Sequence, residues 1–386
     1  MDKIDEVLTR GVDKVYPDRK TVKQVLSRRK IRLYQGFDPS MPNLHLGNLV
    51  GLIKLKQFQD LGHQVIFLIG DFTGMIGDPT DKTTARKKLS RQQVLANAKK
   101  WRQQAGKILR FSGPNPAQIK FNSQWNDKIS FKDLIDITAN FTVQQMLERD
   151  FFTNRLKNNQ PIYLHEFLYP IAQAIDCVEM AVDLEIGGSD QTFNMLIGRH
   201  LAKTLKKKEK YILTTKLLVD SNGQKVGKTT GNAIFLNTPP NQLYGGIMAL
   251  PDQVTMLGFE LLTTVNLNQV KQLSPMDLKK RLAREIVSLV HSPLKAKQAQ
   301  AEFERVFQKR QLPQTAVKLE VNDDNIRIID ILKKIKSSSE AKRLIKNRAV
   351  EINQQTITDP NEIINLNQPK TLRVGKTGFY KLTSKK

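Results

Sequence analysis

The apolar run from Val65 to Ile69 constrains the fold of this chain more than any other feature. Such a continuous run is typical of a strand buried on both faces of a parallel sheet. Residues 31–37 form an earlier apolar-rich run, and the segment from Leu46 carries apolar side chains at helical spacing until it ends near Gly62. Strand, helix and strand in this order predict an α/β fold with a doubly wound parallel sheet, which binds ligands at the carboxyl ends of its strands.

Later segments predict two further domains. A strand over residues 182–186 ends in Gly187-Gly188-Ser189-Asp190, which predicts a tight turn and a helix. Pro239-Pro240 marks a boundary, and the pattern that follows is mostly helical, including residues 275–290. Near Asn325 a third unit begins, with a helix over 328–336, a capping-box pair, Ser337 and Glu340, before a second helix, and short strands from Val350. We predict a catalytic α/β domain with a helical insertion over residues 1–236, an α-helical domain over 237–320 and a small α+β domain over 321–386.

The charge of the chain favours a polyanionic partner. Lys and Arg number 62 against 37 Asp and Glu, a formal charge of +25. Ten basic and no acidic residues lie between Lys82 and Arg110, and residues 321–386 hold 14 basic and 7 acidic ones. Nucleic acid is the favoured partner, with solubility as the alternative explanation of the excess. The run from Lys82 fits a solvated helix face and a surface that meets phosphates equally well.

Several classes of protein do not fit this sequence. No apolar run is long enough to span a bilayer, and the first twenty residues show no secretory signal, so we expect a cytoplasmic location. Cys177 is the single cysteine, which excludes an intramolecular disulfide and a multi-cysteine metal site. The five histidines lack the spacing of zinc ligands, and no protein-bound metal is predicted.

Two short motifs suggest nucleotide chemistry. His45-Leu46-Gly47-Asn48 follows Asp38-Pro39-Ser40 at the predicted start of a helix, where free backbone N–H groups attract anions. Lys225-Val226-Gly227-Lys228-Thr229 lies in a glycine-rich loop, and two lysines on a loop can neutralise the charge that grows on a leaving phosphate. Each motif alone is weak, since a structural histidine or a surface hairpin would explain it.

Together, about 180 residues apart, the motifs resemble the HIGH and KMSKS signatures of class I aminoacyl-tRNA synthetases. Four further stretches are similar to the bacterial tyrosyl-tRNA synthetase family: Tyr34-Gln35-Gly36-Phe37-Asp38-Pro39, Gly74-Met75-Ile76-Gly77-Asp78-Pro79, Tyr169-Pro170-Ile171-Ala172-Gln173-Ala174-Ile175-Asp176 and Gly187-Gly188-Ser189-Asp190-Gln191. The resemblance covers nearly the whole chain. It implies a Rossmann-like catalytic domain, an anticodon-binding helical domain and a C-terminal RNA-binding domain of the ribosomal-protein (alpha-L) type.

The resemblance implies roles for single residues. Tyr34 and Asp176 would hold the phenolic hydroxyl of tyrosine, one donating and one accepting. The ammonium set would be Asp78, Tyr169 and Gln173, with Gln191 nearby. The ATP-binding set would be Asp38, Ser40, His45, Gly47, Asn48, Gly188, Asp190 and Lys228. The catalytic set, which would neutralise developing phosphate charge, would be His45, Lys225, Lys228, Lys82 and Arg86.

The implied reaction joins tyrosine to tRNA in two steps through tyrosyl-adenylate. ATP would be a substrate accompanied by Mg²⁺, and tRNA(Tyr) would be bound by a homodimer. The chain departs from the family signatures at several positions. Asn48 stands where a second histidine is usual, Val226, Gly227 and Thr229 replace Met, Ser and Ser, and Ser40 replaces Thr. Both motif lysines are present, so we expect an active enzyme.

Three alternatives remain at the level of sequence. A tryptophanyl enzyme shares the fold, but indole offers only a donor to Tyr34 and Asp176. An RNA-binding protein that keeps the synthetase scaffold without catalysis would not need the complete set of tyrosine residues. An RNA-modifying enzyme sharing only the C-terminal domain leaves residues 30–232 unexplained.

Overall fold

The computed structural model describes residues 2–80, 88–220, 222–226, 233–308, 316–375 and 378–385. The chain forms two compact units, residues 1–296 and 297–386, which are described separately below. Within the described residues, no helix has the length and apolar character needed to cross a membrane.

The first unit is built on a six-stranded sheet. Its strands are β1 (Val12–Tyr16), β2 (Arg32–Phe37), β3 (Gln64–Ile69), β4 (Gln118–Phe121), β5 (Leu184–Gly188) and β6 (Tyr211–Thr215). Their order is β1-β6-β5-β2-β3-β4, and neighbours from β6 to β4 are parallel. This confirms the predicted parallel sheet. Edge strand β1 runs antiparallel to β6 and was not predicted, because its sequence, Val-Asp-Lys-Val-Tyr, has no apolar run.

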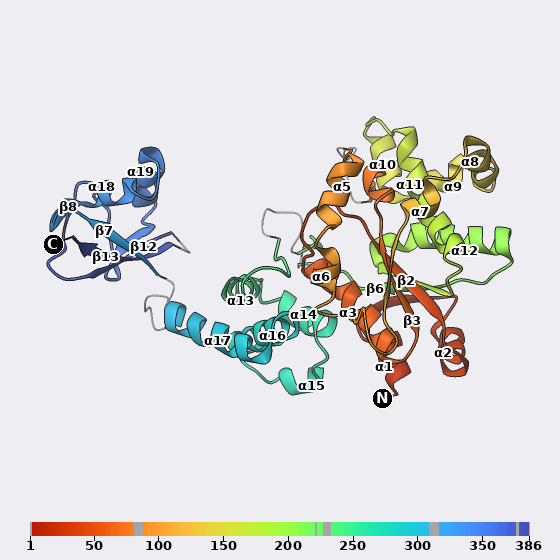
Figure 1. Cartoon of the computed structure of the whole chain (residues 1–386), viewed down its shortest axis with the longest axis horizontal. Helices are drawn as coiled ribbons and strands as arrows, with labels where there is room; N and C mark the ends of the chain where they lie inside the picture. The colour runs from red at the N-terminus through yellow and green to blue at the C-terminus, as the bar shows by residue number, and fades with distance from the viewer. Residues whose placement is uncertain are drawn as a thin grey trace. The chain divides into compact units, whose positions relative to one another are not determined.

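Helices cover both faces of this sheet, as Figure 1 shows. The principal ones are α3 (Leu46–Asp60), α11 (Leu164–Glu179) and α12 (Thr192–Lys206). Helix α3 packs on β2, β3 and β5. On the other face, Tyr34 of β2 and Ile66 of β3 pack in one core cluster with Ile171 and Ile175 of α11. The strand alternation that places Tyr34 on this face also aims it at the site described below.

The strand predicted over residues 182–186 is observed two residues later, at Leu184–Gly188. Asp183 lies before the strand because its carboxylate accepts from the backbone N–H of Arg32 and from the guanidinium of Arg29. The tight turn and helix that were predicted after it are present as η1 (Ser189–Gln191) and α12. The remaining helices before residue 237 are α1 (Lys3–Thr9), α2 (Arg19–Arg28), α4 (Thr73–Ile76), α5 (Arg91–Ala98), α6 (Trp101–Ala105), α7 (Ser123–Asn126), α8 (Phe131–Thr138), α9 (Val143–Leu147) and α10 (Asp150–Lys157).

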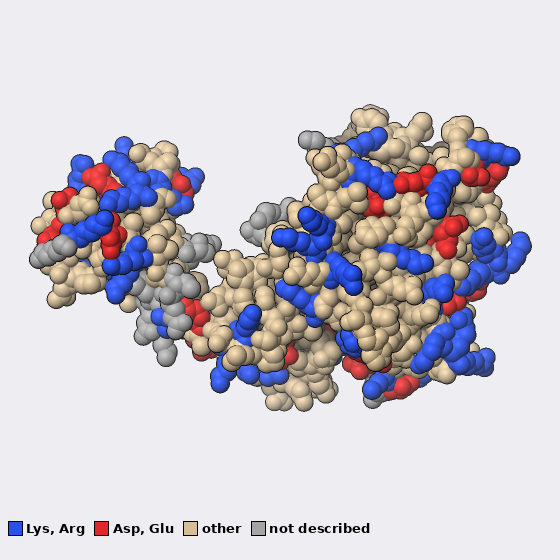
Figure 2. All heavy atoms as spheres, in the orientation of Figure 1, with Lys and Arg blue, Asp and Glu red and all other residues tan. Residues whose placement is uncertain are grey.

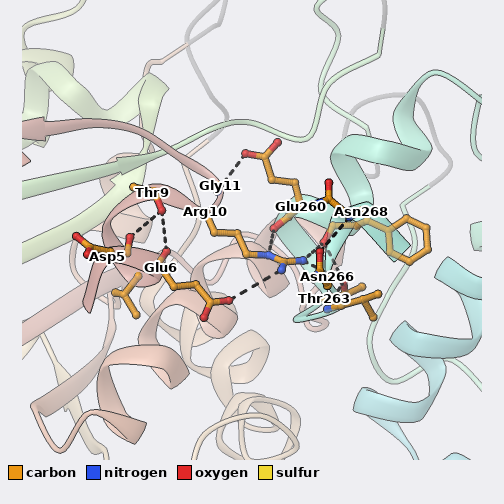
Figure 3. Close-up of polar contacts among 12 residues, drawn as sticks. Asp5, Glu6, Thr9, Arg10, Gly11, Glu260, Thr263, Asn266 and Asn268 are labelled. Carbon is orange, nitrogen blue, oxygen red and sulfur yellow. Dashed lines mark hydrogen bonds and ion pairs between the residues drawn. The ribbon is translucent and has the colours of Figure 1, made fainter. Parts of the chain in front are cut away.

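The helical stretch predicted after residue 239 is confirmed in the part that the structure describes. It comprises α13 (Pro240–Met248), α14 (Val254–Leu262), α15 (Leu267–Val270), α16 (Pro275–Val290) and α17 (Pro293–Phe303). Arg10, at the end of α1, attaches the N-terminal segment to it (Figure 3): its guanidinium donates to the carbonyl oxygens of Phe259 at 2.8 Å and Glu260 at 3.2 Å. These carbonyls lie in the last turn of α14, where the helix leaves acceptors unpaired.

The second unit begins within α17 and continues through the π-helical turn η2 (Glu304–Gln308) into an α+β fold. Its strands are β7 (Val317–Val321), β8 (Asn325–Arg327), β9 (Val350–Ile352), β10 (Gln355–Thr356), β11 (Ile363–Asn365), β12 (Lys370–Val374) and β13 (Gly378–Ser384), and its helices are α18 (Ile328–Lys333) and α19 (Ser338–Lys346). The sheet order is β10-β9-β12-β13-β7, with β11 and β8 paired apart. Helix α18 ends three residues before the predicted Lys336, because residues 334–336 turn towards α19. Ser337 caps α19 by accepting from the N–H of Glu340, as its position predicts.

Candidate active site

The sheet order reverses between β2 and β5. From β2 the chain extends the sheet through β3 to β4, and it then returns to add β5 and β6 on the other side. Ligands of doubly wound folds bind at such a reversal, beyond the carboxyl ends of the strands. A cavity lies here, and every predicted site residue that the structure describes lines it: Tyr34, Asp38, Ser40, His45, Gly47, Asn48, Asp78, Tyr169, Gln173, Asp176, Gly188, Asp190, Gln191 and Lys225. Lys82, Arg86 and Lys228 lie outside the described residues.

The deepest part of the cavity is formed by Tyr34 of β2 and Asp176 of α11, which are 1% and 2% exposed. Asp176 accepts three hydrogen bonds: at Oδ1 from Trp125 Nε1 (2.7 Å) and Asn126 Nδ2 (3.0 Å), and at Oδ2 from Asn122 Nδ2 (3.1 Å). A carboxylate offers about four acceptor positions, so Oδ2 keeps one for a ligand. No described group lies within 3.5 Å and in hydrogen-bond geometry with the hydroxyl of Tyr34, although the carboxylate of Glu185 is near enough to interact with it.

Burial controls the protonation of both groups. It raises the pKa of Asp176 to about 8, although the hydrogen bonds from Trp125, Asn122 and Asn126 act in the opposite direction. At neutral pH and with no ligand bound, the carboxyl is therefore largely protonated, and a ligand that donates to Asp176 favours the ionised form with its four acceptor positions. Burial also raises the pKa of Tyr34 well above 10, and the negative charge of Glu185 raises it further. Tyr34 therefore stays a neutral hydroxyl, which can donate as well as accept.

The residues predicted to hold an ammonium group form one wall of the cavity. Tyr169 and Gln173 lie one turn apart on α11; the hydroxyl of Tyr169 donates to Asp38 Oδ2 at 2.8 Å, and Gln173 Nε2 donates to Glu185 Oε1 at 2.9 Å. Gln191 Nε2 donates to Asp78 Oδ2 at 2.7 Å. The wall thus presents carboxylate and amide oxygens, which suit a cation.

The other side of the cavity combines a helix N-terminus with close backbone approaches. His45 precedes α3, and its backbone N–H donates to Asn48 Oδ1 at 3.0 Å. At Gly188 an added Cβ would lie 2.8 Å from Leu217 Cδ2 and 2.5 Å from Asp190 Oδ1, so a side chain would not fit there without displacing these atoms. Lys225 Nζ pairs with Asp190 Oδ2 at 2.5 Å. A helix N-terminus, a lysine and exposed backbone are features that bind phosphates and sugars.

Sequence reasoning missed four residues of this site. Asn122, Trp125 and Asn126 support Asp176 from the segment around α7, and Glu185 supports Gln173 from β5. Only Glu185 left a signal, because it is a charged residue inside an otherwise apolar strand, between Leu184 and Ile186. Among the described residues no group of three or more His, Cys, Asp or Glu side chains is arranged to hold a metal ion.

Comparison with known proteins decides the family. The sequence profile of "tRNA synthetases class I (W and Y)" matches residues 26–308, and that of the "S4 domain" matches residues 327–368. The tyrosine–tRNA ligase of Aquifex aeolicus is 40% identical over 386 residues, covering 98% of each chain. The tyrosine–tRNA ligase of Thermotoga maritima is 38% identical, covering 98% of this chain and 96% of its own. The chain belongs to the tyrosine–tRNA ligase family.

A solved structure supports the same assignment. The C-terminally truncated mitochondrial tyrosyl-tRNA synthetase of Coccidioides posadasii superposes with a TM-score of 0.64 at 25% identity, covering 78% of this chain and 91% of that one. The predicted family, its α/β fold and its ligase class are therefore confirmed. The profile covers tryptophanyl and tyrosyl enzymes alike, and the two full-length relatives named above carry the tyrosine name. The family's S4 domain lies within the predicted C-terminal domain, residues 321–386.

Membership of the tyrosine–tRNA ligase family gives meaning to one departure from its signature. Asn48 stands where a second histidine is usual, and its side chain bonds the backbone of His45, the residue that precedes α3. A short amide in the first turn of a helix is well suited to such a bond. Asn48 therefore stabilises the geometry of the helix start, and this role does not require a charged side chain.

Proposed function

We propose that the cavity binds L-tyrosine and ATP side by side and that the chain charges tRNA(Tyr) with tyrosine. One observation carries the proposal. In the deepest part of the cavity, the hydroxyl of Tyr34 has no described partner in hydrogen-bond geometry and Asp176 has one acceptor position left. A phenol satisfies both at once, since it can accept from Tyr34 and donate to Asp176. Phenylalanine leaves the Tyr34 hydroxyl without a partner and the last acceptor position of Asp176 empty.

The ammonium group of the amino acid would lie against the wall formed by Asp78, Tyr169 and Gln173, with Gln191 holding Asp78. In this arrangement the oxygens of Asp78 and Gln173 accept from the ammonium, and the carboxylate of tyrosine is left facing the nucleotide side. Tyrosine bound at both ends is oriented for attack, and such orientation is a large part of catalysis in a reaction without a protein nucleophile.

ATP would occupy the side formed by Asp38, Ser40, His45, Gly47 and Asn48, with Gly188 and Asp190 at the ribose. A carboxylate oxygen of tyrosine would attack the α-phosphorus while the bond to the bridging oxygen breaks, giving tyrosyl-adenylate and pyrophosphate. His45, Lys225, Lys228, Lys82 and Arg86 would neutralise the charge that develops. Mg²⁺ would come with ATP, bound mainly by phosphate oxygens.

In the second step a ribose hydroxyl of the terminal tRNA nucleotide would attack the adenylate carbonyl and release AMP. We assign tRNA binding to the basic surfaces, to the α-helical domain (237–320) and to the RNA-binding domain (321–386). Figure 2 shows Lys and Arg spread over the face in view rather than gathered in one patch. In the basic run that starts at Lys82, the exposed and described residues include Lys88, Lys99, Lys100, Arg102 and Arg110. Arg91 and Arg110 also pair with aspartates. We expect this activity in the cytoplasm, where tRNA is charged.

The active form would be a homodimer, as the family resemblance implies. Large apolar side chains stand exposed on α8, on α9 and at the start of α11: Phe131 is 79% exposed, Val143 66% and Leu164 83%. Exposed groups of this kind mark association surfaces. Sedimentation of the full chain would give a dimer, and Leu164→Asp would shift it towards a monomer; a wild-type monomer at micromolar concentration would contradict the assignment.

Amino-acid-dependent exchange of pyrophosphate into ATP tests the proposed reaction. We expect exchange with tyrosine and not with tryptophan or phenylalanine. Exchange with tryptophan alone would establish the tryptophanyl activity instead. No exchange from a folded preparation that still binds tRNA would favour a scaffold that has lost catalysis.

A further inference from the structure

A buried ion pair lies directly behind the ammonium wall of the cavity. Glu185 belongs to β5, and Lys210 comes directly before β6, the strand that pairs with β5. Their side chains are 2% and 0% exposed, and Lys210 Nζ donates to Glu185 Oε2. The desolvation of two buried charges offsets much of their attraction, so stability alone is a poor explanation for such a pair.

Glu185 also reaches the cavity itself, where its side chain contacts Gln173. Its second oxygen, Oε1, accepts from Gln173 Nε2 at 2.9 Å. A glutamine amide has a donating and an accepting end, whereas an ionised carboxylate can only accept. The contact therefore fixes the amide: its nitrogen faces Glu185, and its carbonyl oxygen is left for another partner.

Within the part of the chain that the structure describes, the other titratable groups that interact with Glu185 supply no positive charge. They are Tyr34 of β2, together with Asp176 and Cys177 of α11. Burial raises the pKa of Cys177 to about 12, so this group is a neutral thiol. Lys210 is the cation paired with Glu185, and it also lies beside the Cys177 sulfur.

We propose that Glu185 and Lys210 are positioning residues for the amino-acid substrate. Lys210 keeps Glu185 as an accepting carboxylate, Glu185 holds the amide nitrogen of Gln173, and the carbonyl oxygen of Gln173 is presented to the substrate ammonium. The proposal rests on the proposed function, in which Gln173 binds that ammonium. It adds that recognition of a protonated α-amino group depends on two residues that do not touch it.

The first test compares two ligands by calorimetry on the full chain: L-tyrosine and 3-(4-hydroxyphenyl)propanoate, which lacks the ammonium group. In Lys210→Met, burial drives the uncompensated carboxyl of Glu185 to take up a proton. It can then donate to the amide oxygen, and the Gln173 amide turns round. Tyrosine affinity should fall about tenfold or more, as for the loss of a charge-assisted hydrogen bond, while the affinity of the analogue changes less than about twofold. Equal losses for both ligands, or tighter binding of tyrosine, would overturn the proposal.

A second variant separates positioning from folding. Glu185→Leu combined with Lys210→Met removes both charges and leaves apolar side chains of similar size, a replacement that is often neutral or stabilising. Thermal stability should therefore be kept, while the preference for tyrosine over the analogue is lost. A stable double variant with the wild-type preference would show that the pair does not position Gln173.

A double-mutant cycle tests the route through Gln173. Gln173→Ala should lose the preference, and Lys210→Met added to it should cause no further loss, because both changes remove one interaction. A second loss of the same size would mean that Lys210 acts by another route. Two other results would contradict the proposed function: a wild type without a preference for tyrosine over the analogue, or a Gln173→Ala variant that keeps this preference. Either result would show that Gln173 does not bind the substrate ammonium.

A matched control is the buried pair Arg155–Glu166, in which both side chains are 3% exposed and neither lines the cavity. Arg155→Met also leaves a buried carboxylate uncompensated, so it should lower thermal stability. It should not change the preference between the two ligands. A change equal to that of Lys210→Met would attribute the effect to lost stability and overturn the proposal.

Discussion

The indole N–H of Trp125 donates to Oδ1 of Asp176 across 2.7 Å, from α7 to α11. Together, Trp125, Asn122 and Asn126 occupy three of the acceptor positions of the carboxylate. The fourth position is the one left for a ligand. A ligand that donates to Asp176 must approach from the cavity.

Replacing Asp176 by Asn should therefore weaken tyrosine activation strongly. The amide carries its own N–H₂ donors into a group of three donors, and it loses the charge that accepts from the phenol. We expect kcat/KM for tyrosine in pyrophosphate exchange to fall about 10- to 100-fold, the range for a hydrogen bond to a charged group. The KM for ATP should change little, and unchanged kinetics with tyrosine would remove Asp176 from the pocket.

Removing the hydroxyl of Tyr34 should reduce discrimination rather than abolish activity. In Tyr34→Phe the phenol of the substrate still has Asp176 as a partner. When phenylalanine binds to this variant, no hydroxyl at position 34 is left unpaired. The ratio of kcat/KM for tyrosine to that for phenylalanine should fall about two- to tenfold, as for one neutral hydrogen bond. An unaltered ratio in competition assays would contradict this role.

Lys54 of α3 should make stability depend on pH. Its ammonium donates to the carbonyl oxygens of Val7 and Arg10 at 2.9 Å each, and burial, together with the charge of Arg10, lowers its pKa to about 7. Between pH 7 and about 10.5 the unfolded chain keeps a proton that the folded chain has released, so stability rises with pH in this window, by at most about 1.4 kcal/mol per pH unit. Below pH 7 both states are protonated and the contribution is constant.

Denaturant unfolding of the wild type and of Lys54→Met at a series of pH values measures this effect. The difference in unfolding free energy should move in favour of the wild type from pH 7 to pH 10. Lys56→Met, a substitution on the same helix at a partly exposed side chain, serves as the control and should show no such trend. A pH-independent difference for Lys54→Met would refute the titration.

Arg10 should contribute to stability through the end of α14 (Figure 3). Its side chain is 10% exposed and satisfies two carbonyls, those of Phe259 and Glu260. Arg10→Met leaves the Glu260 carbonyl without this donor, whereas the Phe259 carbonyl keeps the Thr263 hydroxyl at 2.8 Å. We expect a loss of about 1–3 kcal/mol in the free energy of unfolding. Arg19→Met, at an exposed position of α2, should change it by less than about 0.5 kcal/mol. Equal effects of the two variants would show that the cap is unimportant.

Ending the chain after Asp323 should separate the two steps of the reaction. All described residues that line the cavity lie in the first compact unit, residues 1–296. Pyrophosphate exchange should therefore be kept, while aminoacylation of tRNA falls because the S4 domain is removed. Loss of both activities would point to a folding role for the C-terminal unit.

The sequence predicted the parts of this molecule that depend on local patterns. The apolar run at residues 65–69 and the helix before it led to the central strands, and motif resemblance named the cavity-lining residues. Partners brought together by packing were not predictable. Asn122 and Trp125 lie about fifty residues before Asp176, and no local pattern joins them. Lys210 ends a lysine-rich segment, a pattern that is typical of an exposed surface. The pairing of β5 with β6 brings it into the interior, where it is buried against Glu185.

Tyr34, Asp176 and Glu185 come from β2, α11 and β5, segments that meet only when the six-stranded sheet is complete. No partly folded chain that lacks this sheet can offer the same set of contacts, so an amino acid that binds them binds the native state alone. Mass action then makes the substrate a stabiliser of the fold, by about 2.7 kcal/mol at a free concentration one hundred times its Kd. The supply of free tyrosine would therefore help to set how much of this protein stays folded, in addition to how fast it works.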